Sequence, residues 1–362
     1  MPANDIQYMA RALQLANNGH YSTSPNPRVG CVITKNNAVI AEGWHAVAGG
    51  PHAEIVALQH ASGHTHGATA YVTLEPCSHH GKTGPCCEAL INAGITRVVY
   101  GMQDPNPQVA GQGLQKLRDA GILVDGPVLE TQARALNPGF IKRMETGLPF
   151  VRVKMAMSMD GRTAMASGES QWITGEAARQ DVQKLRAQSC AILTAASTVL
   201  IDNAQLNVRE PELLAALGNR RPRRVLLDQH AHIAPDAKIF DDTAPTLWCT
   251  SKAAPTALPS HIQHWSLPLQ HHHADLRVLL AELAGRGCND ILVEAGATLA
   301  GAFLQEKLVD ELIIYMAPKL LGSTARPLFT LPFEAMEEAH NLKILDVRAV
   351  GDDWRFTVKP LD

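Results

Sequence analysis

The chain has 362 residues, which is long for one hydrophobic core and sufficient for two domains of ordinary size. Hydrophobic residues make up 46% of it and charged residues 19%, a balance typical of soluble globular proteins that excludes a disordered chain. The 32 Lys and Arg against 35 Asp and Glu leave a formal charge of -3, so composition indicates no bulk attraction to nucleic acid or membranes.

Neither a signal peptide nor a membrane span is predicted from the sequence. The start, MPANDIQYMARALQLANNG, lacks a basic stretch followed by a continuous apolar run, so we expect no signal peptide. No window approaches the roughly 18 apolar residues of a membrane span. Seven cysteines, an odd number, fit a reducing compartment, and we expect a cytoplasmic protein. The run His271–His273 is expected to be a solvated loop rather than a metal site.

The first part of the chain alternates between helical and strand patterns. Ile6, Met9, Leu13 and Ala16 recur near helical spacing over residues 5–18. The following predicted elements are a hairpin of residues 28–34 and 38–44, a helix at 52–61, a strand at 69–75, a helix at 86–94 opened by Pro85, a strand at 96–102, a helix at 113–121 and a strand at 122–128. This order predicts a three-layer α/β domain.

The segment ALNPGFIKRMETGLP is mostly polar, with Pro and Gly near both ends, and predicts a domain boundary near residue 147. The expected domains are therefore 1–147 and 148–362. In the second, strands are predicted at 150–159, 190–196, 223–228, 246–251, 290–296 and 311–318, helices at 175–188, 274–287 and 299–310, and two last strands around the turn GDD. This pattern predicts a second α/β domain.

Two stretches, HAE at 52–54 and EPCSHHGKTGPCC at 75–87, contain the residue types of a catalytic zinc site. Such a site uses three protein ligands and leaves a fourth position for water, whose pKa the metal lowers to near 7. A carboxylate that is not itself a ligand must then move protons. We predict His52, Cys77 and Cys86 as the ligands and Glu54 as the proton shuttle.

Helix geometry predicts different roles for the adjacent residues Cys86 and Cys87. Pro85 suits a first helical turn, and Cys86 would lie at the positive end of the helix dipole, where a thiolate is favoured. Cys87 points about 100° away and is predicted to be a small buried apolar residue. Side chains two apart on a helix point about 200° apart, so His52 and Glu54 share a site only if the helix start is distorted or a cleft contacts both. A structural zinc, or ordinary buried cysteines, remain alternatives.

The H-x-E pair followed by P-C…C resembles the cytidine-deaminase-like family, here with the eight residues SHHGKTGP between the cysteines. Together with SPNPRVGCV at 24–32 and GWH at 43–45, this longer form resembles the deaminase half of the bifunctional deaminase–reductase family of riboflavin biosynthesis. The resemblance continues through KMAMSMDGRTA, SQWITG, DNAQLNVR and VEAGATLAGAF, and thus covers essentially the whole chain.

The resemblance implies a substrate for the first domain, 2,5-diamino-6-ribosylamino-4(3H)-pyrimidinone 5′-phosphate, hydrolysed at its ring amino group. Asn26 and His45 would contact the pyrimidine, and Lys82 would contact the ribose phosphate; a solvated loop lysine is the alternative for Lys82. The sequence does not decide whether His79 and His80 contact the substrate or lie at the surface.

The second domain lacks the G-x-G-x-x-G fingerprint, but ILVEAGATLAG combines a strand, a glycine turn and a helix whose N–H groups can hold a pyrophosphate. The resemblance implies a dihydrofolate-reductase-like domain that uses NADPH to reduce the ribosyl group to ribityl. The implied substrate residues are Lys154, Ser170, Arg186, Leu206, Arg209 and Glu294. The implied cofactor residues are Ala156, Trp172, Thr198, Asp202, Gly296, Ala297 and Gly301. From the residues alone, Arg186 is typical of an exposed helix position and Trp172 of a core.

The leading prediction is therefore one enzyme that is both a zinc-dependent hydrolase and an NADPH-dependent oxidoreductase. We expect small-molecule substrates, no nucleic acid or membrane partner, and a homo-oligomer, either dimer or tetramer. One rival is a nucleic-acid-editing deaminase fused to a binding module. Another is a non-enzymatic protein with a structural zinc, for which His79 or His80 would supply the fourth ligand.

Overall fold

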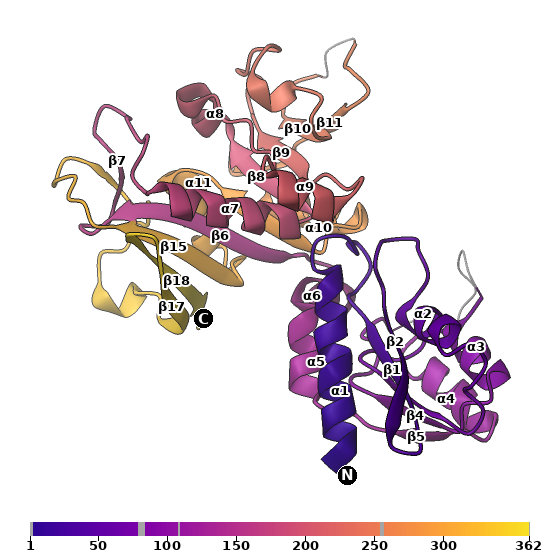
Figure 1. The fold of residues 1–362 in the computed structure, drawn as a ribbon. Coiled ribbons are helices and arrows are strands. Elements are labelled where there is room, and N and C mark those ends of the chain that lie inside the picture. The colour runs from indigo at the N-terminus through magenta and orange to yellow at the C-terminus, as the bar shows by residue number, and fades with distance from the viewer. Residues whose placement is uncertain (1–2, 79–83, 108, 254–256, 362) are drawn as a thin grey trace. The chain divides into compact units, whose positions relative to one another are not determined.

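The computed structural model describes residues 3–78, 84–107, 109–253 and 257–361. The chain forms two compact units, Met1–Leu148 and Pro149–Asp362, and each has a sheet of its own (Figure 1). None of the helices in these described ranges has the length and hydropathy that crossing a membrane requires.

The first unit contains a five-stranded sheet of order β2-β1-β3-β4-β5. Strand β1 pairs antiparallel with β2 and β3, whereas β3, β4 and β5 run parallel. The elements are α1 (Ala3–Ala16), the 3₁₀ turn η1 (Asn17–Gly19), β1 (Gly30–Lys35), β2 (Ala38–Trp44), α2 (Ala53–His60), β3 (Thr69–Val72), α3 (Cys86–Asn92), β4 (Arg97–Tyr100), α4 (Gln112–Asp119), β5 (Leu123–Asp125), α5 (Glu130–Leu136) and α6 (Pro138–Thr146). The predicted order through β5 is confirmed.

Alternation along the strands produces the two faces of this sheet. Cys31 and Ile33 of β1 lie in the core with residues of α2, α3 and α4, while Val32 between them packs with α1, α5 and α6. Figure 1 shows these two groups of helices on opposite sides of the sheet. The predicted three-layer arrangement is confirmed. One position of α1 differs, because Asp5 is buried and Ile6 is 48% exposed.

The polar segment predicted as a boundary is largely helical, since it contains the end of α5 and all of α6. Leu136 and Ile141 reach the core of the first unit. Between the two helices, the Asn137 side chain accepts from the Arg28 backbone N–H at 2.8 Å and donates to its carbonyl at 2.9 Å. The sequence analysis did not predict these two helices, because their few apolar residues lie on one narrow face. Asn137 thereby fixes the backbone two residues beyond Asn26.

The second unit is built on a nine-stranded sheet of order β11-β10-β9-β8-β14-β6-β15-β18-β17. Its strands run parallel except for β18, which pairs antiparallel with both of its neighbours, β15 and β17. Its strands are β6 (Phe150–Ser158), β7 (Arg162–Ala164), β8 (Ala191–Ala195), β9 (Arg223–Leu227), β10 (Thr246–Thr250), β11 (Ile262–Ser266), β12 (Leu269–Gln270), β13 (His273–Ala274), β14 (Asp290–Glu294), β15 (Glu311–Ala317), β16 (Arg326–Pro327), β17 (Leu342–Val350) and β18 (Asp353–Pro360). Its helices are α7 (Glu176–Gln188), α8 (Ala196–Asp202), α9 (Pro211–Leu217), α10 (Leu276–Gly285) and α11 (Ala297–Gln305), with 3₁₀ turns η2 (Lys238–Phe240) and η3 (Met336–Glu338).

The predicted elements of this unit are confirmed. The elements that were not predicted, which are β7, α8, α9, β11, β12, β13 and β16, have no more than seven residues each, a length that gives little periodic signal. Helix α11 begins at Ala297, two residues before its predicted start, with extended Gly296 as N-cap. The run His271–His273 is exposed, as predicted, around a turn where His271 and His272 have positive φ.

Candidate active sites

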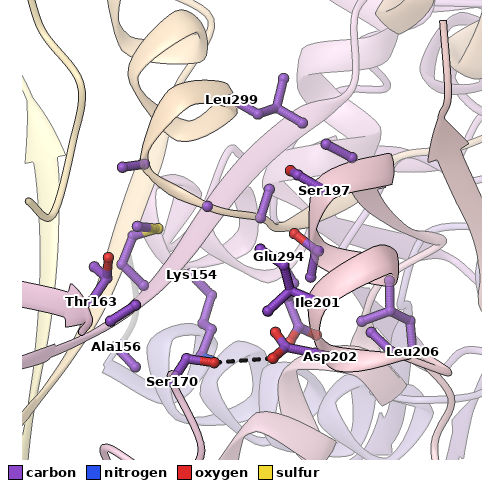
Figure 2. A pocket seen from close by; sticks show the side chains of 18 of the residues that line it. Lys154, Ala156, Thr163, Ser170, Ser197, Ile201, Asp202, Leu206, Glu294 and Leu299 are labelled. Carbon is purple, nitrogen blue, oxygen red and sulfur yellow. Dashed lines mark hydrogen bonds between the residues drawn. The ribbon is translucent and has the colours of Figure 1, made fainter. Parts of the chain in front are cut away.

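A cavity of about 1410 Å³ opens in the second unit, near the carboxyl ends of the parallel strands β8 and β14. Strand β6 contributes Lys154 to it, α8 contributes Asp202, and the first turn of α11 contributes Leu299 (Figure 2). The carboxyl ends of parallel strands are where open α/β sheets bind ligands, because loops and helix N-termini converge there. The volume is large enough for a dinucleotide and a second small molecule together.

The cavity gathers nearly all of the residues predicted for the second domain. Its lining includes Lys154, Ala156, Ser170, Trp172, Arg186, Thr198, Asp202, Leu206, Arg209, Glu294, Gly296 and Ala297. Gly301 is the exception. It is buried on α11, where an added Cβ would lie 2.2 Å from the Thr330 carbonyl oxygen, and it is not among the residues that line the cavity.

A buried ion pair organises one wall of the cavity. The Arg186 guanidinium donates to both carboxylate oxygens of Glu294, at 2.6 and 2.9 Å, and to the Asn207 carbonyl oxygen at 3.0 Å. Burial acts to raise the pKa of Glu294, but the charges of Arg186 and Lys154 lower it. Arg186 is therefore not the exposed helix residue that its sequence context suggested, and its donors are already engaged.

The cations Lys154 and Arg209 also line the cavity, and their contacts differ. Burial lowers the pKa of Lys154, which pairs in register with Glu294 across β6 and β14. Arg209 donates its backbone N–H to Gln183 at 2.9 Å, but among the residues the structure describes its guanidinium has no hydrogen-bond acceptor. A ligand anion would therefore find Arg209 more available than Arg186.

At the rim, Trp172 is 61% exposed rather than part of a core. The Arg179 guanidinium lies 4.8 Å from its ring centroid, a cation–π contact, and the Lys319 ammonium donates to its carbonyl oxygen at 2.8 Å. Ser170 donates to the Asp202 carboxylate at 3.0 Å, as Figure 2 shows. Sequence reasoning missed Arg179 and Gln183. Helical spacing from Arg186 along α7 could have found both.

The lining also fits a dinucleotide phosphate group. Gly296, the N-cap of α11, has no side-chain cap hydrogen bond, and an added Cβ there would meet nothing within 4 Å. The first N–H groups of this nine-residue helix are thus approachable from the cavity, and such groups bind phosphates.

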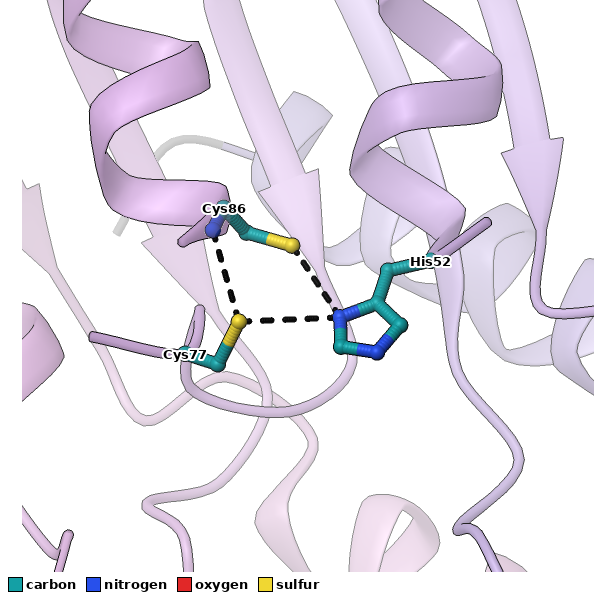
Figure 3. Close-up of side chains that lie close together, drawn as sticks. All are labelled: His52, Cys77 and Cys86. Atoms are coloured by element: carbon teal, nitrogen blue, oxygen red, sulfur yellow. Dashed lines mark hydrogen bonds between the residues drawn. The ribbon is translucent and has the colours of Figure 1, made fainter. Parts of the chain in front are cut away.

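In the first unit, His52, Cys77 and Cys86 form one cluster (Figure 3). The His52 Nδ1 atom lies 3.2 Å from the Cys86 sulfur and 3.6 Å from the Cys77 sulfur. Ligand atoms on a tetrahedral zinc ion are about 3.5 Å apart, given its bond lengths of about 2.0–2.3 Å. Donor types and spacing therefore fit zinc, and no fourth His, Cys, Asp or Glu of the described residues belongs to the cluster.

Backbone geometry brings the three side chains together. His52 is the N-cap of α2 with extended backbone (φ -73°, ψ 161°), so the 200° separation expected within a helix does not apply to it and Glu54. The Cys86 backbone N–H donates to the Cys77 sulfur at 3.3 Å. A hydrogen bond from Cys86 lowers the pKa of Cys77 to about 4, whereas that contact and burial raise the pKa of Cys86. Bound zinc would hold both sulfurs as thiolates.

Glu54 lies beside this cluster and is only 3% exposed. Burial, followed by the nearby Cys77 charge, raises the pKa of its carboxyl group to about 7. Its Oε2 atom is buried and has no hydrogen-bond partner among the residues that the structure describes. A buried carboxylate oxygen without a partner is costly, and it indicates that a proton-carrying ligand belongs there.

The predicted pyrimidine residues are also close together. The His45 Nδ1 donates to the Pro51 carbonyl oxygen at 2.9 Å, so Nε2 accepts from the Asn26 amide at 3.1 Å. Burial lowers the pKa of His45, and its ring stands edge-on to His52 with centroids 5.5 Å apart. Lys82, His79 and His80 lie outside the described residues.

Comparison with known proteins extends these observations to both units. Residues 2–102 match the family model of the cytidine and deoxycytidylate deaminase zinc-binding region, and residues 149–356 match the RibD C-terminal domain. The chain is 52% identical to the Escherichia coli riboflavin biosynthesis protein RibD, covering 96% of this chain and 97% of that protein. It is 48% identical to the Haemophilus influenzae protein of the same name, covering 99% and 98%.

Solved structures agree over the full length. A structure of Acinetobacter baumannii RibD is 46% identical, covers 99% of each chain and superposes with a TM-score of 0.92. A Thermotoga maritima structure, described as a diaminohydroxyphosphoribosylaminopyrimidine deaminase/5-amino-6-(5-phosphoribosylamino)uracil reductase, is 34% identical, with 99% coverage of each chain and a TM-score of 0.87.

The fold and the two sites thus define a zinc-binding deaminase domain joined to a reductase domain. More particularly, the chain belongs to the family of bifunctional deaminase–reductases of riboflavin biosynthesis. It is accordingly a hydrolase in one half and an oxidoreductase in the other.

The cluster predicts opposite results for the adjacent cysteines. Cys86→Ser should lose zinc, because a hydroxyl is a poor substitute for a thiolate ligand. Cys87→Ser should keep it, because the Cys87 sulfur instead donates to the carbonyl oxygens of Pro76 (3.1 Å) and Gly113 (3.4 Å), and a hydroxyl can do the same. Zinc per chain, measured by mass spectrometry after dialysis, tests both. The reverse pattern would assign the metal to Cys87.

Proposed function

We propose that residues 1–147 are the deaminase and residues 148–362 the reductase, and that they act in succession on one phosphorylated pyrimidine. The deaminase converts 2,5-diamino-6-ribosylamino-4(3H)-pyrimidinone 5′-phosphate and water to the corresponding uracil and ammonia. The reductase then reduces the ribosyl group of that uracil to ribityl. The description of the Thermotoga maritima structure, which names both activities, supports this choice of substrates.

The unpaired, buried oxygen of Glu54 beside a three-ligand cluster carries the deaminase proposal. His52, Cys77 and Cys86 would hold zinc, which would lower the pKa of a bound water so that hydroxide is available at neutral pH. Glu54 would move two protons of the attacking water in succession, the first to the ring nitrogen and the second to the amino group that leaves as ammonia. A carboxyl group with a pKa of about 7 suits both directions of transfer.

Around the reacting ring, the neutral His45 and the amide of Asn26 hold the pyrimidine. Their mutual hydrogen bond orients the Asn26 side chain before substrate arrives. Lys82 is the proposed contact of the ribose phosphate, which is a suitable role for a flexible cation.

A purely structural zinc is the alternative for the first unit. It requires four protein ligands, and the described residues supply three. It also leaves Glu54 without a reason to be buried and unpaired next to them. The catalytic assignment accounts for both observations.

Removing the proton shuttle should separate the two activities. Glu54→Gln keeps the shape of the side chain but cannot take up a proton, so deamination should fall by about 10² or more while zinc content is unchanged. Ammonia release measures this loss. Reduction of the already deaminated uracil should proceed at the wild-type rate in the same variant.

Two results would count against this assignment. A variant that releases ammonia at nearly the wild-type rate would remove Glu54 from the mechanism. A folded variant that loses both activities would indicate one shared site instead of two.

In the second unit, the residues that line the cavity would hold NADPH and the uracil. NADPH would supply the hydride for C1′ of the ribosyl group when it is bound there. The start of α11 at Gly296 and Ala297 binds its pyrophosphate, and Trp172, Thr198, Asp202 and Ala156 complete its site. Lys154 and Glu294 are the polar groups beside the reacting carbon, and Arg186 holds Glu294 in place.

Arg209 is the proposed ligand of the substrate 5′-phosphate, together with the predicted contacts of Ser170 and Leu206. Charge-assisted hydrogen bonds to phosphate contribute about 1.5–3 kcal/mol, so Arg209→Ala should weaken apparent substrate affinity roughly 10–150-fold. Affinity for NADPH and the rate of deamination should be unchanged. Part of the loss is expected in turnover, because remote binding also positions the reacting carbon.

NADPH oxidation across substrate concentrations, with a separate cofactor titration, measures the two affinities of Arg209→Ala. Arg221→Ala is the matched control, because its guanidinium donates to the backbone carbonyls of Gly218 and Arg220 outside the cavity. If the cofactor titration weakens and the substrate dependence does not, Arg209 binds NADPH.

We also propose that the protein is cytoplasmic. All seven cysteines are free thiols, which is the state expected in a reducing compartment.

The protein is further proposed to be a homo-oligomer that associates through β17. This strand is last in the order of its sheet, and all of its residues except Val350 are exposed. Ile344 is 61% exposed and Val347 42%, and Trp354 of the paired strand β18 is 46% exposed. An exposed apolar edge strand is a liability in a monomer and is typical of a surface covered by a second copy.

Charges placed on this surface should dissociate the oligomer. In the double variant Ile344→Asp and Val347→Asp, two buried carboxylates would lack partners, so sedimentation should give the mass of one chain. Val39→Asp, which replaces an exposed apolar residue of β2, is the control and should sediment as wild type. An unchanged mass in the double variant would exclude β17 from the interface.

A further inference from the structure

Glu75 is a buried carboxylate that neither proposed reaction uses. It follows β3 and is 5% exposed, and its own N–H donates to the Met102 carbonyl oxygen at 2.9 Å. Its two carboxylate oxygens accept hydrogen bonds from four backbone N–H groups in and before the first turn of α4. These belong to Asp104 at 3.2 Å, Gly111 at 2.9 Å, Gly113 at 2.9 Å and Leu114 at 3.4 Å.

The same short segment continues into the metal cluster. Cys77 is two residues beyond Glu75, and its carbonyl oxygen accepts from the Cys87 N–H at 3.2 Å. The intervening Pro76 carbonyl oxygen accepts from the Cys87 thiol at 3.1 Å. From the other side, Gly113 approaches so closely that an added Cβ would lie 2.0 Å from the Pro76 oxygen. Residues 75–77 are thus held between the starts of α3 and α4.

We infer that Glu75 is a positioning residue for the metal ligand Cys77. Its carboxylate is an acceptor with two oxygens, and four backbone N–H donors occupy both of them. Three of these N–H groups, those of Gly111, Gly113 and Leu114, lie at the positive end of α4, where a negative charge is favoured, and the fourth, that of Asp104, lies in the preceding loop. This attachment fixes the backbone two residues before Cys77, and so determines where the Cys77 sulfur points relative to His52 and Cys86.

The inference rests on the proposed zinc ligands, and it concerns the strength and geometry of metal binding. In Glu75→Gln an amide N–H₂ replaces one oxygen and faces backbone donors, so the segment must shift. Outer residues that orient metal ligands alter affinity by about 10–100-fold when changed. Zinc affinity of the full chain, measured by competition with a chromogenic chelator, should fall by at least about tenfold. The absorption bands of the Co²⁺-substituted protein, which report ligand geometry, should change as well.

Two further variants separate positioning from general stability. Asp5→Asn also removes a buried carboxylate from the first unit, one that accepts from Arg97 (2.9 Å) and Tyr71 (2.8 Å). It should lower the melting temperature but leave zinc affinity and the Co²⁺ spectrum as in wild type. Gly113→Ala presses on the Pro76 oxygen without removing the carboxylate, and should reproduce the Co²⁺ change of Glu75→Gln. It also provides the test if Glu75→Gln does not fold.

The inference is overturned if Glu75→Gln, or Gly113→Ala in its place, melts lower but keeps wild-type zinc affinity within about twofold and an unchanged Co²⁺ spectrum. Cys77→Ser distinguishes this from failure of the ligand assignment. If Cys77→Ser retains tightly bound zinc, the proposed ligand set is wrong, and the positioning role fails with it. If Cys77→Ser loses zinc and Glu75→Gln does not weaken it, the ligand set stands and only the role of Glu75 is rejected.

Discussion

The hydrogen bond from the Cys86 backbone N–H to the Cys77 sulfur is the contact on which the first site depends. It joins the start of α3 to the loop after β3 and places the two sulfurs beside His52. A thiolate at a helix start is stabilised by the N–H groups that the helix leaves unpaired. The loop between the cysteines can therefore be long, because the helix start and not the spacing determines where they meet.

In the second unit, the corresponding constraint is the burial of Glu294 at the end of a parallel strand. A carboxylate at that depth requires a cation, and Arg186 supplies two hydrogen bonds from the adjacent helix α7. Lys154, on the next strand, adds a second positive charge and remains in the cavity. The wall thus combines a neutralised ion pair with cations that a phosphorylated ligand can reach.

Most of the sheet architecture could be predicted from the sequence, because alternation in β1 and continuous apolar runs such as β14 are strong local signals. The helices α5 and α6 could not, since their polar composition resembles a linker and Asn137 is fixed by Arg28, more than a hundred residues away in sequence. From the residues alone, Trp172 was expected in a core and Arg186 at an exposed position, and the structure shows the opposite for each. Burial of a side chain depends on partners that local sequence does not contain.

By itself, the sequence determined which chemical groups are present and roughly where they lie along the chain: a His-x-Glu pair, two Pro-Cys pairs, and a glycine turn after a buried strand. The family resemblance then implied their roles as a set. Only the tertiary structure decided that His52 lies before its helix and not in it, and that Gly301 packs against Thr330. The reason is physical. Each of these outcomes depends on backbone conformation and on contacts between segments distant in sequence, and no pattern of neighbouring residues specifies either.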